Sequence, residues 1–105
     1  MLNFMLAYSG TDDMLEAVKK ITDGRKKGSE ISDKTIKENL MTRNLPPVDY
    51  LIRTGGEPHN STGFMMWDLA DSQLYFSSEN FPDFDEKKFD EALEEYARRQ
   101  RRFGG

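Results

Sequence analysis

Residues 48–56 read VDYLIRTGG, a short run of β-forming side chains that ends in an arginine, a threonine and two glycines. Two prolines stand directly before this run. They end any preceding helix, because proline donates no backbone hydrogen bond and disfavours helical geometry at the residue before it. The sequence therefore predicts a strand over 48–52 that brings Arg53, Gly55 and Gly56 to its carboxyl end.

Further strands and helices are predicted on both sides of this strand. An apolar run over 2–8 and the segment 74–76 are predicted as strands of a parallel sheet, the first one buried on both faces. The order strand, helix, helix, strand, loop, strand, helix is typical of an α/β fold with a parallel sheet, flanking helices and right-handed crossovers. In such sheets ligands bind beyond the carboxyl ends of the strands, which directs attention to residues 8–10 and 53–63.

Three helices are predicted from capping residues and apolar spacing. Their expected bounds are a cap at Thr11 to Asp23, a cap at Ser32 through Leu40 and Met41, and Asp85 to about Arg102. The apolar positions of the first and last helices predict their buried faces: Met14, Leu15, Val18 and Ile21, and then Phe89, Leu93, Tyr96 and Ala97.

The size and composition predict one folded domain. The chain has 105 residues, of which 36% are hydrophobic and 32% charged, a mixture that excludes a disordered chain. It has no cysteine and one histidine, which excludes disulfides, thiolate zinc sites and a histidine metal cluster within one chain. No apolar stretch approaches the roughly 20 residues of a transmembrane helix, and no secretory signal is recognisable, so we expect a soluble cytoplasmic protein. The formal net charge of -4 argues against a nucleic-acid or anionic-membrane binder.

The turn after the predicted central strand has two interpretations. Arg53 is a permanent cation, and the amides of Gly55 and Gly56 can approach a ligand without obstruction by a Cβ atom, which together favours phosphate oxygens as the ligand. Alternatively, Arg53 pairs with Glu57 in an ordinary surface turn. His59 adds a donor, but a single loop histidine is more often solvated than functional.

A basic cluster near the end of the chain has two interpretations as well. Arg98, Arg99, Arg101 and Arg102 lie within five residues. Basic residues in a last helical turn favour the negative end of the helix dipole, and many helices end in this way. The Phe-Gly-Gly that follows is not required by such a cap, so a binding role stays open. The segment 23–27, in contrast, lies at a helix C-terminus, where the dipole repels anions.

Taken together, several segments carry a resemblance to a known family: VDYLIRTGGE at 48–57, FMMW at 64–67, LYF at 74–76, PDFD at 82–85 and RRFGG at 101–105. Their order and spacing resemble the C-terminal half of a cis-prenyltransferase, the undecaprenyl diphosphate synthase family. The resemblance covers the whole chain and implies a single partial domain over 1–105 with the C-terminal half of that fold.

The resemblance implies a Mg²⁺-dependent condensation of isopentenyl diphosphate with an allylic diphosphate such as farnesyl diphosphate. It implies that Arg53 holds the acceptor diphosphate, and that Arg102 and Gly104 match a terminal motif that reaches an active site across a dimer. The family's arginine and serine pair aligns with His59 and Ser61 when counted forward from Glu57. Counted back from Phe64, the same pair aligns with Asn60 and Thr62.

Departures from the family pattern concern catalysis. The half that carries the family's aspartate loop is absent, so no catalytic residue is assigned, and Gln73 stands where the family has a glutamate associated with Mg²⁺. An amide is a poorer ligand for that cation than a carboxylate, so Mg²⁺ binding by this chain alone is doubtful.

Three hypotheses about function follow from the resemblance. The chain supplies contacts to isopentenyl diphosphate and a dimer surface but is inactive alone; or it is a non-catalytic partner of a complete prenyltransferase; or it is a folded remnant without a ligand. In the first two cases we expect a homodimer, or association with an N-terminal half or a complete enzyme, in the cytoplasm, with peripheral membrane contact through the lipid product.

Overall fold

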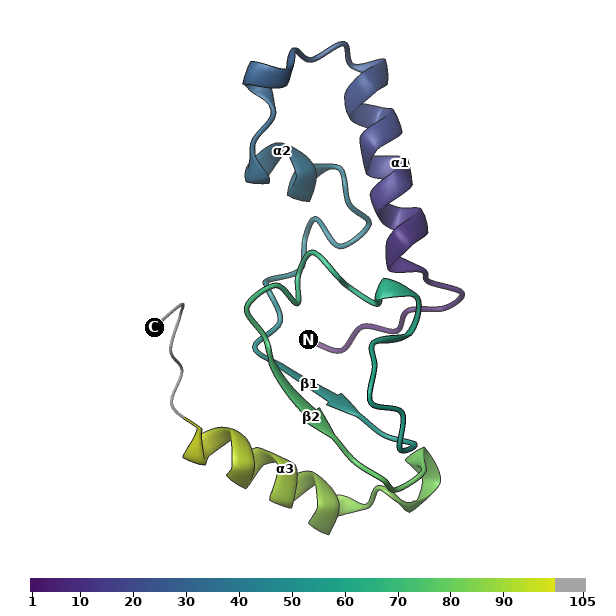
Figure 1. Ribbon diagram of the computed structural model, residues 1–105, viewed down its shortest axis with the longest axis vertical. Coiled ribbons are helices and arrows are strands. Elements are labelled where there is room, and N and C mark those ends of the chain that lie inside the picture. The colour runs from purple at the N-terminus through teal and green to yellow at the C-terminus, as the bar shows by residue number, and fades with distance from the viewer. Residues whose placement is uncertain (100–105) are drawn as a thin grey trace. The chain divides into compact units, whose positions relative to one another are not determined.

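The computed structural model describes residues 1–99 and divides the chain into two compact units. The first unit holds residues 1–46 and 61–67, and the second holds residues 47–60 and those from 68 onward. The first contains helices α1 (Gly10–Asp23) and α2 (Asp33–Glu38), and the second contains strands β1 (Tyr50–Arg53) and β2 (Gln73–Phe76) and helix α3 (Glu86–Arg98) (Figure 1). No helix within residues 1–99 has the length and apolar character needed to cross a membrane.

Helix α1 is capped by Ser9, whereas the sequence predicted a cap at Thr11. The Ser9 hydroxyl accepts a hydrogen bond from the Asp12 amide at 3.4 Å. The backbone of Ser9 is extended, at φ -130° and ψ 126°, which is the geometry of an N-cap residue, whereas Thr11 is already helical. The helix therefore begins at Gly10, two residues earlier than a cap at Thr11 predicts.

The buried face of α1 is narrower than its apolar pattern predicted. Asp13, Ala17 and Ile21 are buried. They are four residues apart and so lie on one face of the helix. Leu15 and Val18 were predicted to be buried but are 53% and 49% exposed. With about 3.6 residues per turn, Leu15 lies nearly opposite this face and Val18 lies to its side.

Helix α2 begins as predicted at a cap formed by Ser32. Its hydroxyl accepts from the Thr35 amide, and the Thr35 hydroxyl accepts from the Ser32 amide. After the helix, Leu40 is buried but Met41 is 67% exposed, which corrects the prediction that both are buried. The backbone amide of Met41 donates to a carboxylate oxygen of Asp13 at 2.9 Å, so the backbone at this residue faces α1.

The predicted first strand over 2–8 is wrong, because these residues form no strand. Leu2, Phe4 and Leu6 are 79%, 80% and 87% exposed. Ala7 has a φ of 51°, a left-handed conformation that interrupts an extended run. A strand also needs a neighbour for its backbone hydrogen bonds, and the sheet of the described residues contains β1 and β2 alone.

The second unit is built on the predicted parallel strand pair. In β1 and β2, Tyr50 lies opposite Gln73 and Arg53 opposite Phe76. The ladder continues past the strand ends, since the amide of Ser77 donates to the carbonyl of Arg53 at 2.8 Å. The α/β class and the parallel direction are therefore confirmed, with β1 shifted by one or two residues from its predicted bounds.

Helix α3 covers one face of this sheet (Figure 1). Asp85 caps it by accepting a hydrogen bond from the Lys88 amide at 2.9 Å. The Tyr50 hydroxyl of β1 donates to the carbonyl of Ala92 at 2.8 Å, and the rings of Tyr50 and Tyr96 lie 4.8 Å apart. Ala92 is fully buried, because its small side chain lets the helix approach the sheet.

Two predictions about α3 need correction. Phe89 and Leu93 were predicted to be buried but are 45% and 43% exposed, since the side that carries Ala92 faces the sheet. The helix ends at Arg98, before the predicted Arg102, because Arg99 is extended with φ -74° and ψ 135°.

Candidate functional site

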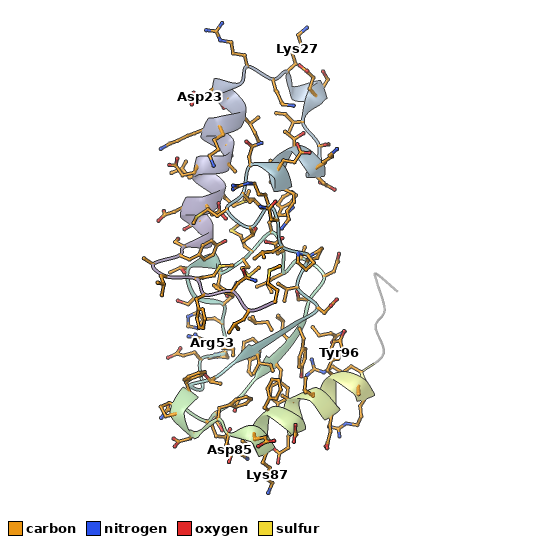
Figure 2. All side chains as sticks on the ribbon, turned by 180° about the vertical axis from the view of Figure 1, so that it is seen from behind. Asp23, Lys27, Arg53, Asp85, Lys87 and Tyr96 are labelled. Atoms are coloured by element: carbon orange, nitrogen blue, oxygen red, sulfur yellow. The ribbon has the colours of Figure 1, made fainter. Side chains whose placement is uncertain are left out.

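Arg53 is the last residue of β1, at the carboxyl end of the parallel sheet, where the sequence predicted a site (Figure 2). Side chains alternate along a strand, and the Tyr50 side faces α3, so Arg53 belongs to the opposite face together with Phe76. Its Nε atom is buried and has no hydrogen-bond partner. Buried polar atoms are nearly always hydrogen-bonded, so this nitrogen requires a partner from outside the described part of the chain, such as a water molecule or a ligand.

The alternative in which Arg53 pairs with Glu57 is not observed. Glu57 instead lies 3.5 Å from His59, measured from its carboxylate oxygen to Nδ1 of the imidazole. Both side chains are more than half exposed. Within residues 1–99, the guanidinium of Arg53 therefore has no carboxylate to neutralise it.

The two glycines after Arg53 form a turn with left-handed backbone. Gly55 has a φ of 89° and Gly56 a φ of 71°, values that favour glycine strongly over other residues. The Gly55 amide donates to the carbonyl of Glu79 at 2.7 Å, and the Gly56 amide donates to the carbonyl of Ser77 at 3.0 Å. A Cβ atom on Gly55 would meet nothing within 4 Å. In this conformation Gly55 has open space where a side chain would be, while the amides of both glycines bind the neighbouring loop.

The loop that accepts these two bonds contains residues that sequence reasoning missed. Ser77 is buried, and its hydroxyl donates to a carboxylate oxygen of Glu79 at 2.5 Å. The Nζ atom of Lys88 in α3 lies 3.3 Å from the other oxygen of that carboxylate. The Ser77 hydroxyl bond, followed by the bonds from the Glu79 amide and Lys88, lowers the pKa of Glu79, and Glu79 raises the pKa of Lys88. Serine, glutamate and lysine are common on surfaces, so no local sequence pattern distinguishes them.

The other site residues predicted in the loop over 53–63, which are His59, Asn60 and Ser61, are exposed. His59 and Asn60 belong to the second unit, next to the glycine turn in the chain. Ser61 is assigned to the first unit. Arg102 and Gly104 lie outside the described residues.

In the first unit, the turn that begins at Ser61 is fitted closely to the start of α1. A Cβ atom on Gly10 would lie 1.7 Å from the carbonyl oxygen of Gly63. The rings of Tyr8 and Phe64 meet edge to face at 5.7 Å. Gly10 is therefore required by close packing of two backbones, a role that its position after the predicted strand does not reveal.

Residues 1–99 hold no group of three or more histidine or carboxylate side chains arranged to bind a metal ion. Gln73 lies 3.5 Å from the Arg99 guanidinium, measured from its Oε1 to Nη1, so its amide oxygen faces a cation. A second cation is disfavoured at that oxygen.

Arg98 and Arg99 of the basic cluster have different surroundings. Arg98 is exposed and pairs with Glu95, one turn earlier. Arg99 also contacts Glu95, but it donates to the carbonyl of Leu74 at 2.7 Å and lies over the ring of Tyr50 at 5.8 Å. Arg99 thus has a structural role in holding α3 to the sheet.

Comparison with known proteins identifies the family and agrees with the α/β fold. The family model of the undecaprenyl diphosphate synthases, which are prenyltransferases, matches residues 1–104. The chain is 43% identical over 108 residues to the (2E,6E)-farnesyl-diphosphate-specific ditrans,polycis-undecaprenyl-diphosphate synthase of Haemophilus influenzae, and 38% identical to that of Escherichia coli. The chain therefore belongs to the undecaprenyl diphosphate synthase family of prenyltransferases.

A solved structure shares the fold. Lavandulyl diphosphate synthase from Lavandula x intermedia, in complex with dimethylallyl diphosphate, superposes with a TM-score of 0.81 at 34% identity over 95% of this chain. Each of these matches uses nearly the whole chain, but only 45%, 42% and 44% of the Haemophilus, Escherichia and Lavandula proteins respectively. The chain thus spans less than half the length of the relatives that it matches.

Proposed function

We propose that this chain supplies the contacts of a cis-prenyltransferase to the diphosphate of isopentenyl diphosphate, with Arg53 as the principal ligand. The observation that carries the proposal is the unpaired, buried Nε of Arg53. An arginine presents a planar fork of donors that matches phosphate oxygens, and its charge persists at every physiological pH. The open space over Gly55 leaves room for a ligand next to this fork.

Electrostatics at the end of β1 support an anionic ligand. Glu57, four residues after Arg53 in the chain, is engaged with His59 rather than Arg53. His59 and Asn60 are exposed donors just after the turn, and we propose that they add weaker contacts to the same diphosphate. Ser61 is proposed as a further hydroxyl contact, and Arg102 and Gly104 as contacts from the end of the chain.

Titration calorimetry with isopentenyl diphosphate tests the role of Arg53. A hydrogen bond to a charged group contributes about 1.5–3 kcal/mol, so we expect Arg53→Ala to weaken binding roughly 10- to 150-fold. Arg53→Lys keeps the charge without the fork and should fall between the two. Arg98→Ala is the matched control, because it removes an exposed arginine that pairs with Glu95. Equal affinity of Arg53→Ala and the unchanged chain would contradict the proposal.

We further propose that residues 1–105 do not catalyse chain elongation alone. The support is that the chain spans less than half of the length of the relatives it matches. Purified chain should therefore show no turnover with farnesyl diphosphate, isopentenyl diphosphate and Mg²⁺. Measurable elongation would contradict this statement and leave the binding proposal standing.

Association with another polypeptide completes this proposal. Leu74 and Phe76 of β2 are 45% and 44% exposed, and Phe81 is 78% exposed, so apolar side chains are left open in the second unit. We propose that a second copy, an N-terminal half or a complete prenyltransferase covers them, in the cytoplasm. Sedimentation of the chain alone and with a complete prenyltransferase separates these partners, and a monomer in both experiments would contradict the proposal.

A further inference from the structure

We propose that Ser77, Glu79 and Lys88 form a brace that holds the Gly55-Gly56 turn in the conformation that binds diphosphate. The brace is the hydrogen-bonded set of these three side chains, and it acts through the two carbonyl groups that receive the glycine amides. These are positioning residues, since we infer no contact between them and the ligand. The inference rests on the proposed function, because the ligand is the diphosphate bound by Arg53.

The brace begins in the backbone. The amides of Gly55 and Gly56 donate to the carbonyls of Glu79 and Ser77 at 2.7 and 3.0 Å. Two successive glycines with positive φ have little conformational preference of their own, so their geometry depends on these two bonds. Any movement of residues 77–79 therefore moves the turn.

The side chains fix residues 77–79 in turn. The Ser77 hydroxyl donates to the Glu79 carboxylate and accepts from the Glu79 amide, the latter at 3.3 Å, which closes a ring within three residues. Ser77 is only 8% exposed, so water competes poorly for its hydroxyl. The two carbonyl groups that hold the glycines thus belong to residues that are also tied to each other.

Helix α3 anchors this ring. The Lys88 ammonium lies 3.3 Å from Glu79 and 3.7 Å from Glu91, and the Lys88 amide is bound by the cap residue Asp85. The side chains of Lys88 and Glu79 are 38% and 30% exposed, so the ion pair is partly shielded from solvent. A chain of contacts therefore runs from the first turn of α3 through Glu79 to Gly55.

The functional consequence is pre-organisation. A turn that is held in its binding conformation loses less entropy when the ligand arrives, and so binds more tightly than a mobile one. Loosening the brace should reduce affinity without removing any group that contacts the ligand.

Two substitutions separate this role from simple electrostatics. Glu79→Gln removes a negative charge, which would strengthen binding of an anion if only long-range charge mattered, whereas the brace predicts binding weakened about three- to tenfold. Lys88→Ala should weaken binding to a similar extent. The matched controls are Glu94→Gln and Lys87→Ala, both exposed positions of α3. Figure 2 shows Lys87 pointing away from the helix into solvent.

The experiment uses the full chain and two readouts. Isopentenyl diphosphate is titrated by calorimetry, and amide hydrogen exchange at Gly55 and Gly56 is followed by NMR without ligand. The brace predicts faster exchange at both glycines in Glu79→Gln and Lys88→Ala, and unchanged exchange in the two controls. Tighter binding by Glu79→Gln, or exchange equal to that of Glu94→Gln, would overturn it.

Failure of the brace is distinguishable from failure of the proposed function. If Arg53→Ala binds as the unchanged chain does, the binding proposal fails, while hydrogen exchange still tests the brace. If Arg53 is required but both brace variants bind and exchange normally, the brace alone fails. Lys88→Ala removes a partly exposed side chain, so it leaves a folded protein to measure even if Glu79→Gln does not fold.

Discussion

The guanidinium of Arg99 donates a hydrogen bond to the carbonyl of Leu74 at 2.7 Å and thereby joins the end of α3 to β2. The same side chain contacts Glu95, Gln73 and the ring of Tyr50. A residue that belongs to an arginine cluster in the sequence is thus part of the packing of the second unit. Arg98, its neighbour in the chain, makes none of these hydrogen bonds or ring contacts to the sheet, so substitutions of the two arginines can be compared directly.

Arg99→Ala should lower the free energy of unfolding by about 1.5–3 kcal/mol, the range for a hydrogen bond to a charged group. Arg98→Ala should cost clearly less, because exposed ion pairs contribute little. Urea denaturation followed by tyrosine fluorescence measures both. Equal losses for the two variants would show that Arg99 does not hold α3 to the sheet.

Gly10→Ala should destabilise the first unit by about 1–3 kcal/mol, as overpacking of a close contact does. The reason is the 1.7 Å separation between the added Cβ and the Gly63 carbonyl oxygen. Gly28→Ala is the control, because a Cβ atom there meets nothing within 4 Å. Thermal unfolding by circular dichroism compares the two, and a Gly10→Ala variant as stable as Gly28→Ala would disprove the close packing.

Tyr50→Phe should lower stability by about 1 kcal/mol, the usual contribution of one intramolecular hydrogen bond. The variant keeps the ring contacts with Tyr75 and Tyr96 and loses only the bond to the Ala92 carbonyl. Burial raises the pKa of Tyr50 above its ordinary value of 10.0. The unfolded chain therefore ionises first, and stability should fall as the pH rises through 10. Unfolding measured against pH should show a smaller alkaline loss in Tyr50→Phe.

The lowered pKa of Glu79 predicts an acid-dependent loss of stability. Its carboxyl ionises more readily in the folded chain than at the ordinary value of 4.5. The contribution is complete above that value and is lost as the pH falls through the lowered pKa of the folded state. Glu79→Gln should flatten this acid limb in urea denaturation at a series of pH values. The limb of Glu94→Gln should match that of the unchanged chain, and a persistent limb in Glu79→Gln would assign it to other groups.

Local patterns predicted β2 and the start of α2 well, because their signals are contained in a few neighbouring residues, but α2 ends at Glu38, before the predicted Leu40 and Met41. Ser32 and Thr35 form a cap that depends on a spacing of three. The apolar run over 2–8 carried an equally strong local signal, yet it forms no strand. A strand is defined by hydrogen bonds to another segment, and no local pattern reports whether that segment is in place.

The candidate site also combines residues that a local pattern predicted with residues that no local pattern predicted. The type and order of Arg53, Gly55 and Gly56 predicted a turn after the strand, and the structure has one. The expectation that the glycine amides face a ligand is not met, because they donate to the carbonyls of Glu79 and Ser77. Ser77, Glu79 and Lys88 escaped notice, since their relation to that turn arises only when two parallel strands place their carboxyl ends side by side.

The sequence by itself determined the family, the α/β class and the position of an arginine followed by two glycines after a strand. These follow from residue order, which is present before folding. Only the tertiary structure decided that Arg53 has an unpaired buried nitrogen, that the glycine amides bind residues 77–79 and that Arg99 holds α3 to the sheet. Each of these depends on groups more than 20 residues apart or on burial, and both exist only once the chain has packed.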